Sequence, residues 1–134
     1  MRVMIDTNIF ISAILFPKGQ AAAALNKALV SPYQPVTCSY VVDELKRKFC
    51  EKFPNKMTEL NEFLETSSSV IKVVDTPHSL VKTEALIRDK KDRPILRAAL
   101  NAGADLFLTG DKDFLESAII DPRIISVSEF LADY

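Results

Sequence analysis

Short apolar segments alternate along this chain with longer segments of helical periodicity. Five stretches have the apolar character of strands, namely residues 2–5, 36–38, 70–74, 105–109 and 123–126. Helical patterns lie between them, over residues 20–30, 40–53, 57–66 and 93–103. Strands separated by helices favour parallel pairing, because the chain must cross over before it can run in the same direction again. The alternation therefore predicts a three-layer α/β/α fold around a parallel sheet of about five strands.

The size and charge of the chain limit what such a fold can carry. Its 134 residues, 48% of them hydrophobic, suffice for one core, so we expect a single domain over residues 1–134. The 17 basic and 18 acidic residues nearly cancel, which excludes a global positive field for nucleic acid or anionic lipid. The longest apolar run, residues 9–16, is too short to span a bilayer. We expect no membrane association and a cytoplasmic location.

Four acidic residues stand at the ends of these elements. Asp6 follows the first strand, Glu44 lies early in a helix, Asp92 precedes a helix, and Asp111 follows the fourth strand. Parallel sheets bind ligands beyond the carboxyl ends of their strands, so we expect these carboxylates to share one pocket. Two carboxylates about 5 Å apart repel by roughly 3 kcal/mol at an effective dielectric constant of about 20. A divalent cation neutralises such a cluster, and oxygen ligands favour one or two Mg²⁺ or Mn²⁺ ions over zinc.

The first two acids have competing interpretations. Asp6 is also a good helix N-cap, since an aspartate before a helix commonly accepts a backbone N–H. Glu44 competes with Asp43 and with the simple role of an acid in the first turn of a helix. Thr7 and Asn8 can support metal-bound water or a carboxylate by hydrogen bonding, but capping explains them nearly as well.

The other two acids have close neighbours of the same type. Asp92 competes with Asp89 in a charged loop, and we place Asp92 in the site and Asp89 behind it as a supporting residue. Asp111 competes with Asp113, and we favour Asp111 because it is nearer the strand end. Thr109 is placed to hydrogen-bond a carboxylate of the site.

Four segments carry a resemblance to a known family. They are Val-Met-Ile-Asp-Thr-Asn at residues 3–8, Val-Asp-Glu-Leu at 42–45, Arg-Asp-Lys-Lys-Asp at 88–92, and Ala-Gly-Ala-Asp-Leu-Phe-Leu-Thr-Gly-Asp-Lys-Asp-Phe-Leu at 102–115. The chain resembles the PIN-domain family over nearly its whole length, and within it the toxin components of prokaryotic toxin–antitoxin pairs. The Thr-Gly-Asp-Lys-Asp-Phe motif is the most specific part.

The resemblance implies a fold, an activity and partners. It implies a five-stranded parallel sheet and a metal-dependent endoribonuclease that acts on single-stranded or structured RNA. It also implies an antitoxin protein as partner and a homodimer. The metal ligands that it implies are Asp6, Glu44, Asp92 and Asp111, and Asp113 also matches the last motif.

The chemistry of the residues agrees with that activity. A bound metal lowers the pKa of a water to make the nucleophile, and a second metal stabilises the departing oxygen. The chain has 1 histidine, His78, which excludes an acid–base ribonuclease built on a histidine pair. Metal-assisted attack on the phosphodiester is the mechanism that remains.

Basic residues flank two of the proposed ligands. Lys46 and Arg47 follow Glu44, and Lys91 and Arg93 flank Asp92, where they can hold RNA phosphates at the rim of an acidic centre. A solvated helix face with ordinary charge pairing is an equal alternative for each of them. Core packing is favoured over base stacking for three aromatic residues: Phe10, Phe16 and Phe114.

Two other functions compete with a nuclease. A Mg²⁺-dependent phosphotransfer or receiver-like domain also gathers acids at strand ends. Such a domain needs a second acid at the position of Asn8, or an acid pair at Met4 and Ile5, and neither is present. A non-catalytic PIN-fold binding module is the third alternative, and the complete set of acids argues against it.

Local signals at the helix ends are uneven. Ser39 and Ser128 are predicted N-caps of the helices that follow them. Pro94 in a first turn and Gly103 as a stop delimit one helix. The segment from residue 75 to 91 has weak patterns, with a short helix expected near residues 80–87.

Overall fold

The computed structural model describes residues 1–134, and its strands form a single sheet. The five strands are β1 (Arg2–Ile5), β2 (Gln34–Cys38), β3 (Lys72–Val74), β4 (Leu106–Leu108) and β5 (Arg123–Ile125). They lie in the order β3-β2-β1-β4-β5, and every neighbouring pair is parallel. All carboxyl ends therefore lie at one edge of the sheet, which places the turns after β1, β2 and β4 next to one another.

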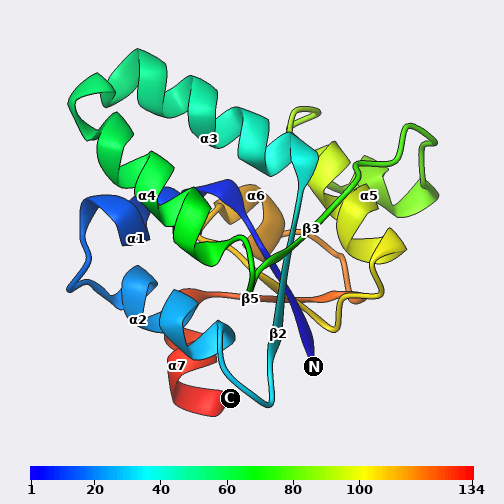
Figure 1. The fold of residues 1–134 in the computed structure, drawn as a ribbon. Coiled ribbons are helices and arrows are strands. Elements are labelled where there is room, and N and C mark those ends of the chain that lie inside the picture. The colour runs from blue at the N-terminus through cyan, green and yellow to red at the C-terminus, as the bar shows by residue number, and fades with distance from the viewer.

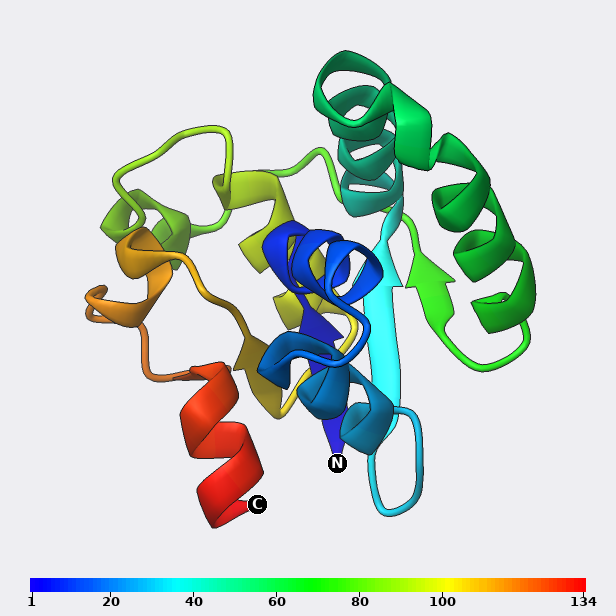
Figure 2. The same ribbon diagram turned by 90° about the vertical axis from the view of Figure 1, so that its left-hand side faces the viewer.

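Helices cover both faces of this sheet. The α-helices are α1 (Thr7–Leu15), α2 (Gln20–Ala28), α3 (Ser39–Lys52), α4 (Met57–Ser67), α5 (Arg93–Asn101), α6 (Lys112–Leu115) and α7 (Val127–Asp133). Two short 3-10 helices, η1 (Pro54–Lys56) and η2 (Lys82–Leu86), complete the elements. Helices α1 and α2 lie on one side of the sheet and α5 on the other (Figures 1 and 2). The predicted three-layer α/β fold with a parallel five-stranded sheet is confirmed.

The central strands are apolar because helices pack on both of their faces. Val3, Met4 and Ile5 of β1 are all fully buried, as expected for a parallel strand inside a sandwich of helices. Phe107 of β4 packs on Phe114, with 4.5 Å between the ring centroids. This packing ties the short helix α6, and the turn before it, firmly to the sheet.

The helices α3 and α4 form a hairpin at the carboxyl edge. Figure 1 shows α3 rising from the end of β2 and α4 returning beside it. Phe63 of α4 packs against Phe10 of α1, with ring centroids 5.7 Å apart. The hairpin is thus attached to α1 as well as to the sheet, and it holds the first turn of α3 over the ends of the strands.

Three details of the expected structure are wrong. Phe16 is 66% exposed, because it follows the last turn of α1 and points away from the core that holds Phe10 and Phe114. The closing helix is capped by Ser126, which forms a capping box with Glu129, and not by Ser128. The other predicted cap, Ser39, is the first residue of α3 and bonds another segment instead.

The apolar face of α2 belongs to the core. Ala22, Ala24, Leu25 and Ala28 are buried, and the helix packs between α1 and α7. No single helix has the length and apolar character needed to cross a membrane, and the pair α1 and α2 passes that test only together, with a bend of 118°.

Candidate metal centre

Asp6 lies at the centre of the carboxyl edge and is held by two hydrogen bonds. It caps α1, and its Oδ1 accepts the backbone N–H of Thr7 at 2.7 Å. Its Oδ2 accepts the hydroxyl of Thr109 at 2.7 Å. The carboxylate is 4% exposed, so these contacts fix its position in a nearly dry environment. Capping and a place in the acidic centre are therefore compatible roles for the same residue.

Thr109 links this carboxylate to the next acid. Its Oγ1 accepts the backbone N–H of Asp111 at 3.0 Å while it donates to Asp6. Asp111 in turn caps α6, because its Oδ1 accepts the N–H of Asp113 at 2.9 Å. Asn8 joins the two turns, since its Oδ1 accepts the N–H of Gly110 at 3.3 Å. The turns after β1 and β4 form one hydrogen-bonded unit.

Glu44 reaches the centre from the second turn of α3. Its side chain is buried, and the charges of Arg47 and Lys48, one turn later, lie 3.7 and 3.9 Å from its Oε2. Neighbouring Asp43 is exposed. The charge of Glu44 acts on Asp6, which places Glu44 and not Asp43 at the acidic centre.

The remaining acids gather at the N-terminus of α5 and the start of α6. Carboxylate oxygens of Asp89, Asp92 and Asp113 all lie within 4.8 Å of one another. Asp113 is also paired with Arg88, whose Nη2 lies 2.6 Å from its Oδ1. Asp111 lies beside Asp92, and its side chain helps to raise the pKa of Asp92. The tightest group therefore includes Asp89 and Asp113, which the sequence made weaker candidates for metal ligands than Asp92 and Asp111.

The electrostatics of this group show unfavourable crowding of negative charge. Burial raises the pKa of Asp6 to about 6, although the hydrogen bonds from Thr109 and Thr7 oppose the rise; the charges of Asp111 and Glu44 add to it. Burial, the contact with Asp111 and the charges around it raise the pKa of Asp92 to about 8. At pH 7 Asp92 therefore holds a proton in most molecules, whereas Asp6 is mostly ionised, and a divalent cation that binds these carboxylates would displace the proton of Asp92.

The donor set fits a hard divalent cation. Every side chain of the group offers oxygen, and no histidine or cysteine lies in it. Thr7, next to Asp6, has a buried hydroxyl oxygen with no hydrogen-bond partner within the protein. No other buried side-chain nitrogen or oxygen lacks a partner. Buried polar groups are normally satisfied, so a further oxygen-rich ligand or an ordered water is expected beside Thr7.

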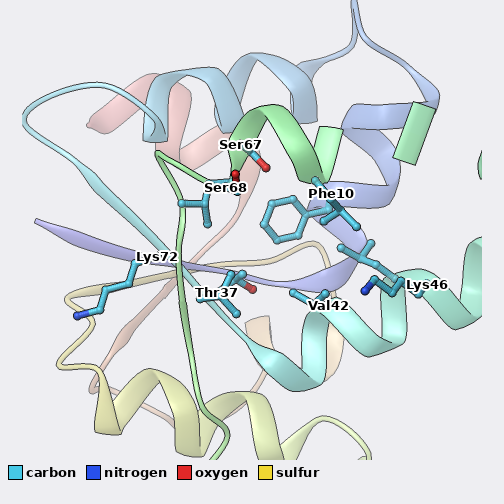
Figure 3. A pocket seen from close by; sticks show the side chains of 11 residues that line it. Phe10, Thr37, Val42, Lys46, Ser67, Ser68 and Lys72 are labelled. Atoms are coloured by element: carbon cyan, nitrogen blue, oxygen red, sulfur yellow. The ribbon is translucent and has the colours of Figure 1, made fainter. Parts of the chain in front are cut away.

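The basic residues singled out in the sequence lie in different environments. Arg47 approaches Glu44, and Lys91 is exposed beside the Asp92 group. The Nε of Arg93 donates to the carbonyl oxygen of Ile87 at 2.9 Å. Lys46 lies on another face of α3, where it lines a separate cavity of about 450 Å³ (Figure 3).

Tyr40 is a neighbour of the centre that the sequence motifs do not include. It lies one turn before Glu44 on α3, so the two side chains share a helix face. Its own burial raises the pKa of Tyr40, and the charges of Glu44, Asp92 and Asp89 add to the rise, whereas Arg47 opposes it. The spacing of four residues to Glu44 was the only signal available in the sequence.

Three solved structures share this fold at low sequence identity. VapBC2 from Rickettsia felis bound to a promoter DNA fragment has a TM-score of 0.70 and 19% identity, with 94% of this chain and 98% of that chain covered. DNA-bound VapBC from Salmonella typhimurium has a TM-score of 0.67 and 21% identity, with 95% and 98% covered. A toxin–antitoxin complex from Klebsiella pneumoniae has a TM-score of 0.62 and 20% identity, with 93% and 97% covered.

The sequence comparisons place the chain in a family without giving a characterised relative. No curated protein sequence matches it. A family model described as PIN domain matches residues 2–113, which spans β1 to the start of α6 and includes every acidic residue of the centre. The chain therefore belongs to the PIN domain family.

Proposed function

We propose that this protein is a Mg²⁺- or Mn²⁺-dependent endoribonuclease that cleaves single-stranded RNA. The observation that carries the proposal is the convergence of Asp6, Glu44, Asp92 and Asp111 at the carboxyl edge of the sheet, with raised pKa values for two of them. Acids held so close are unfavourable in a structural role, because they repel each other. Membership of the PIN domain family supports the same conclusion.

The chain has residues for each task that such a reaction requires. Asp6, Glu44, Asp92 and Asp111 would hold the cation, with Asp113 and Asp89 assisting from the adjacent group. A bound divalent cation supplies an acidified water and a positive charge that offsets the charge of the phosphodiester. Thr109 keeps Asp6 and Asp111 in fixed orientation, so the carboxylates need little rearrangement.

Basic side chains at the rim would bind the RNA backbone. Arg47 and Lys48 lie beside Glu44, and Lys91 and Arg93 lie beside Asp92. Their positive charges offset the repulsion between an acidic centre and a polyanion, and they would guide single-stranded RNA across it.

We further propose that the protein is the toxin of a toxin–antitoxin pair. Three proteins with this fold were solved as toxin–antitoxin or VapBC complexes, which supports an antitoxin as partner. A homodimer acting on RNA in the cytoplasm is part of the same proposal. Growth arrest on expression in a bacterial host, relieved by Asp111→Asn, tests the toxin role, and light scattering of the purified protein tests the dimer.

A cleavage assay tests the enzymatic proposal directly. Labelled single-stranded RNA is incubated with purified protein in Mg²⁺, Mn²⁺ or EDTA, alongside the variants Asp111→Asn and Asp133→Asn. Asp133 is an exposed aspartate of α7 and controls for the change in charge. We expect cutting that needs the metal, is lost in Asp111→Asn and is kept in Asp133→Asn. Cutting that survives in Asp111→Asn would point to a contaminating nuclease and count against the proposal.

A further inference from the structure

A second pocket opens beside the acidic centre. Its volume is about 640 Å³, within the range of about 300 to 1,000 Å³ typical of ligand sites. Tyr40 and Asp43 line it from α3, where they lie four residues and one residue before Glu44. Arg97 lines it from α5, the helix that Asp92 precedes. The pocket thus uses the same two helices that carry acids of the centre.

The walls of this pocket are fixed by hydrogen bonds. Thr76 Oγ1 accepts the backbone N–H of Tyr40 at 3.1 Å and lies 3.1 Å from the hydroxyl of Ser39. Arg97 donates from Nη1 to the carbonyl oxygen of Pro77 at 3.0 Å and from Nε to Glu84 at 2.7 Å. Residues 75–78 are therefore attached to both α3 and α5. A pocket held open in this way loses little conformational freedom when it binds a ligand.

Two carboxylates of the pocket have no cation partner. Asp43 and Asp75 are exposed, and neither takes part in any of the ion pairs of the protein. The guanidinium of Arg97 is already committed to Glu84 and Pro77. Such a lining disfavours a phosphate group, and it offers hydrogen-bond acceptors beside the half-buried ring of Tyr40. A flat ligand that presents N–H donors matches these features.

We propose that this pocket binds a guanine base of the RNA next to the cleaved phosphodiester. The base stacks on Tyr40, and its N1–H and N2 amino groups donate to the carboxylate of Asp43 or Asp75. The inference rests on the proposed nuclease function, and it assigns a base preference to the same site. In single-stranded RNA the Watson–Crick edge is free to be read in this way.

The preference for guanine follows from the pattern of donors on each base. Guanine presents two adjacent donors, which match the two oxygens of one carboxylate. Adenine and cytosine present an amino group next to a ring nitrogen that accepts, and uracil presents one N–H between two carbonyl oxygens. On these three bases, one carboxylate oxygen faces an acceptor and is repelled.

The single histidine of the protein makes the test direct. His78 lines the pocket, so the NMR signals of its ring report on occupancy without overlap from other histidines. The probes are GMP, IMP, AMP and UMP, titrated in Mg²⁺; they contain no phosphodiester to be cut. We expect saturable shifts with GMP and an affinity about tenfold higher than for AMP or UMP. IMP lacks the N2 amino group and should fall between them.

Variants identify the residues that make the contact. Asp43→Asn or Asp75→Asn should lower GMP affinity about tenfold and leave AMP affinity unchanged. Tyr40→Leu should weaken all four nucleotides, whereas Tyr40→Phe should keep the stacking. Glu51→Gln removes the same charge from an exposed position of α3 outside the pocket and should change nothing. Equal affinity for the four nucleotides, or no response of His78 to any of them, would overturn the inference.

Mapping of RNA cleavage separates this inference from the function on which it rests. On single-stranded RNA that contains every dinucleotide, we expect cuts next to guanosines, with the preference lost in the aspartate variant that loses GMP affinity. Metal-dependent cutting without base preference would refute the guanine pocket and leave the nuclease in place. No metal-dependent cutting, even with selective GMP binding, would refute the nuclease instead.

Discussion

Two carboxylates at the helix α5 stand in opposite electrostatic situations. Glu84 is buried against Arg97, with 2.7 Å between Oε2 and Nε, and it also accepts the backbone N–H of Val81. Asp92, directly before the same helix, lies among Asp89, Asp111 and Asp6, and its pKa is raised by burial and by these acids. The first carboxylate forms an ion pair with a cation of the fold, and the second forms no ion pair and lies among other acids.

The difference separates a carboxylate that stabilises the fold from one that the fold tolerates. A buried charge that serves structure is expected to be paired, since an unpaired charge in the interior is unfavourable. The partly buried Asp92 and the buried Asp6 depart from that rule, whereas the buried Glu84 obeys it. We infer that the acidic group is kept for binding a cation, and substitutions at the two positions should therefore have opposite effects on stability.

The largest effect is expected on catalysis. Asp92→Asn should lower metal-dependent RNA cleavage by more than about 100-fold, since even residues that only support metal ligands contribute about 10- to 100-fold. The same substitution should leave the metal-free protein equally or more stable, because a neutral amide replaces a crowded carboxyl group whose ionised form is unfavourable. Cleavage rates and urea unfolding of one preparation measure both. A variant that cuts at the parental rate would remove Asp92 from the site.

The opposite case is a loss of stability without a change at the acidic centre. Glu84→Gln should lower the free energy of unfolding by roughly 3 kcal/mol, since it leaves the guanidinium of Arg97 buried without its charge partner. Denaturant unfolding measures the change, and it should be larger than any loss caused by Asp92→Asn. Equal changes in the free energy of unfolding for Glu84→Gln and Asp92→Asn would show that the two carboxylates do not differ in their contribution to stability.

The contrast can also be tested by pH. In the folded state the pKa of Asp92 is about 8 and that of Asp6 about 6, whereas an unfolded aspartate has about 3.9. Between these values the folded protein binds more protons than the unfolded one, so the metal-free protein should lose stability as pH rises from about 4 to about 8. Unfolding in EDTA at several pH values measures the slope. Asp92→Asn should make the free energy of unfolding depend less on pH. A free energy of unfolding that increases as pH rises from about 4 to about 8 would contradict the assignment.

The smallest effect is expected at the exposed ion pair. Arg88→Gln removes the contact with Asp113 and should change the free energy of unfolding by less than about 1 kcal/mol, because the guanidinium is 72% exposed. The same unfolding experiment measures it, with Glu84→Gln as the reference for a buried pair. A loss as large as that of Glu84→Gln would show that Arg88 is essential to the loop.

The sheet and its helices could be predicted because their signals are local. The buried apolar run of β1 and the first turn of α5, which contains Pro94, are visible in a few neighbouring residues. Gly103 adopts a φ of 66°, the left-handed conformation that ends α5 and that glycine allows. The predicted N-cap of α7, Ser128, is two residues too late. Ser126 and Ser128 are both suitable N-cap residues, and only the packing of the helix decides between them.

The site could be predicted only in part, because its contacts join distant segments. The motif acids could be named, but the group of Asp89, Asp92 and Asp113 depends on how two loops meet. The pocket beside it depends on Thr76, which bonds Ser39 across 37 residues of sequence. No periodicity links such residues. Residues 75–91 have weak sequence patterns because part of this segment is held in place by the side chain of Arg97 and not by regular secondary structure.

The ion pair of Arg88 with Asp113 has a consequence for how the protein responds to free metal. The guanidinium lies within 4.0 Å of Asp113 and Glu116 and acts as a counterion attached to the chain. A divalent ion that approaches Asp113 must exchange with this counterion, and a tethered group keeps the same effective concentration however far the protein is diluted. The free-metal concentration at which the proposed metal displaces Arg88 should therefore be set by the protein itself and should not depend on the protein concentration.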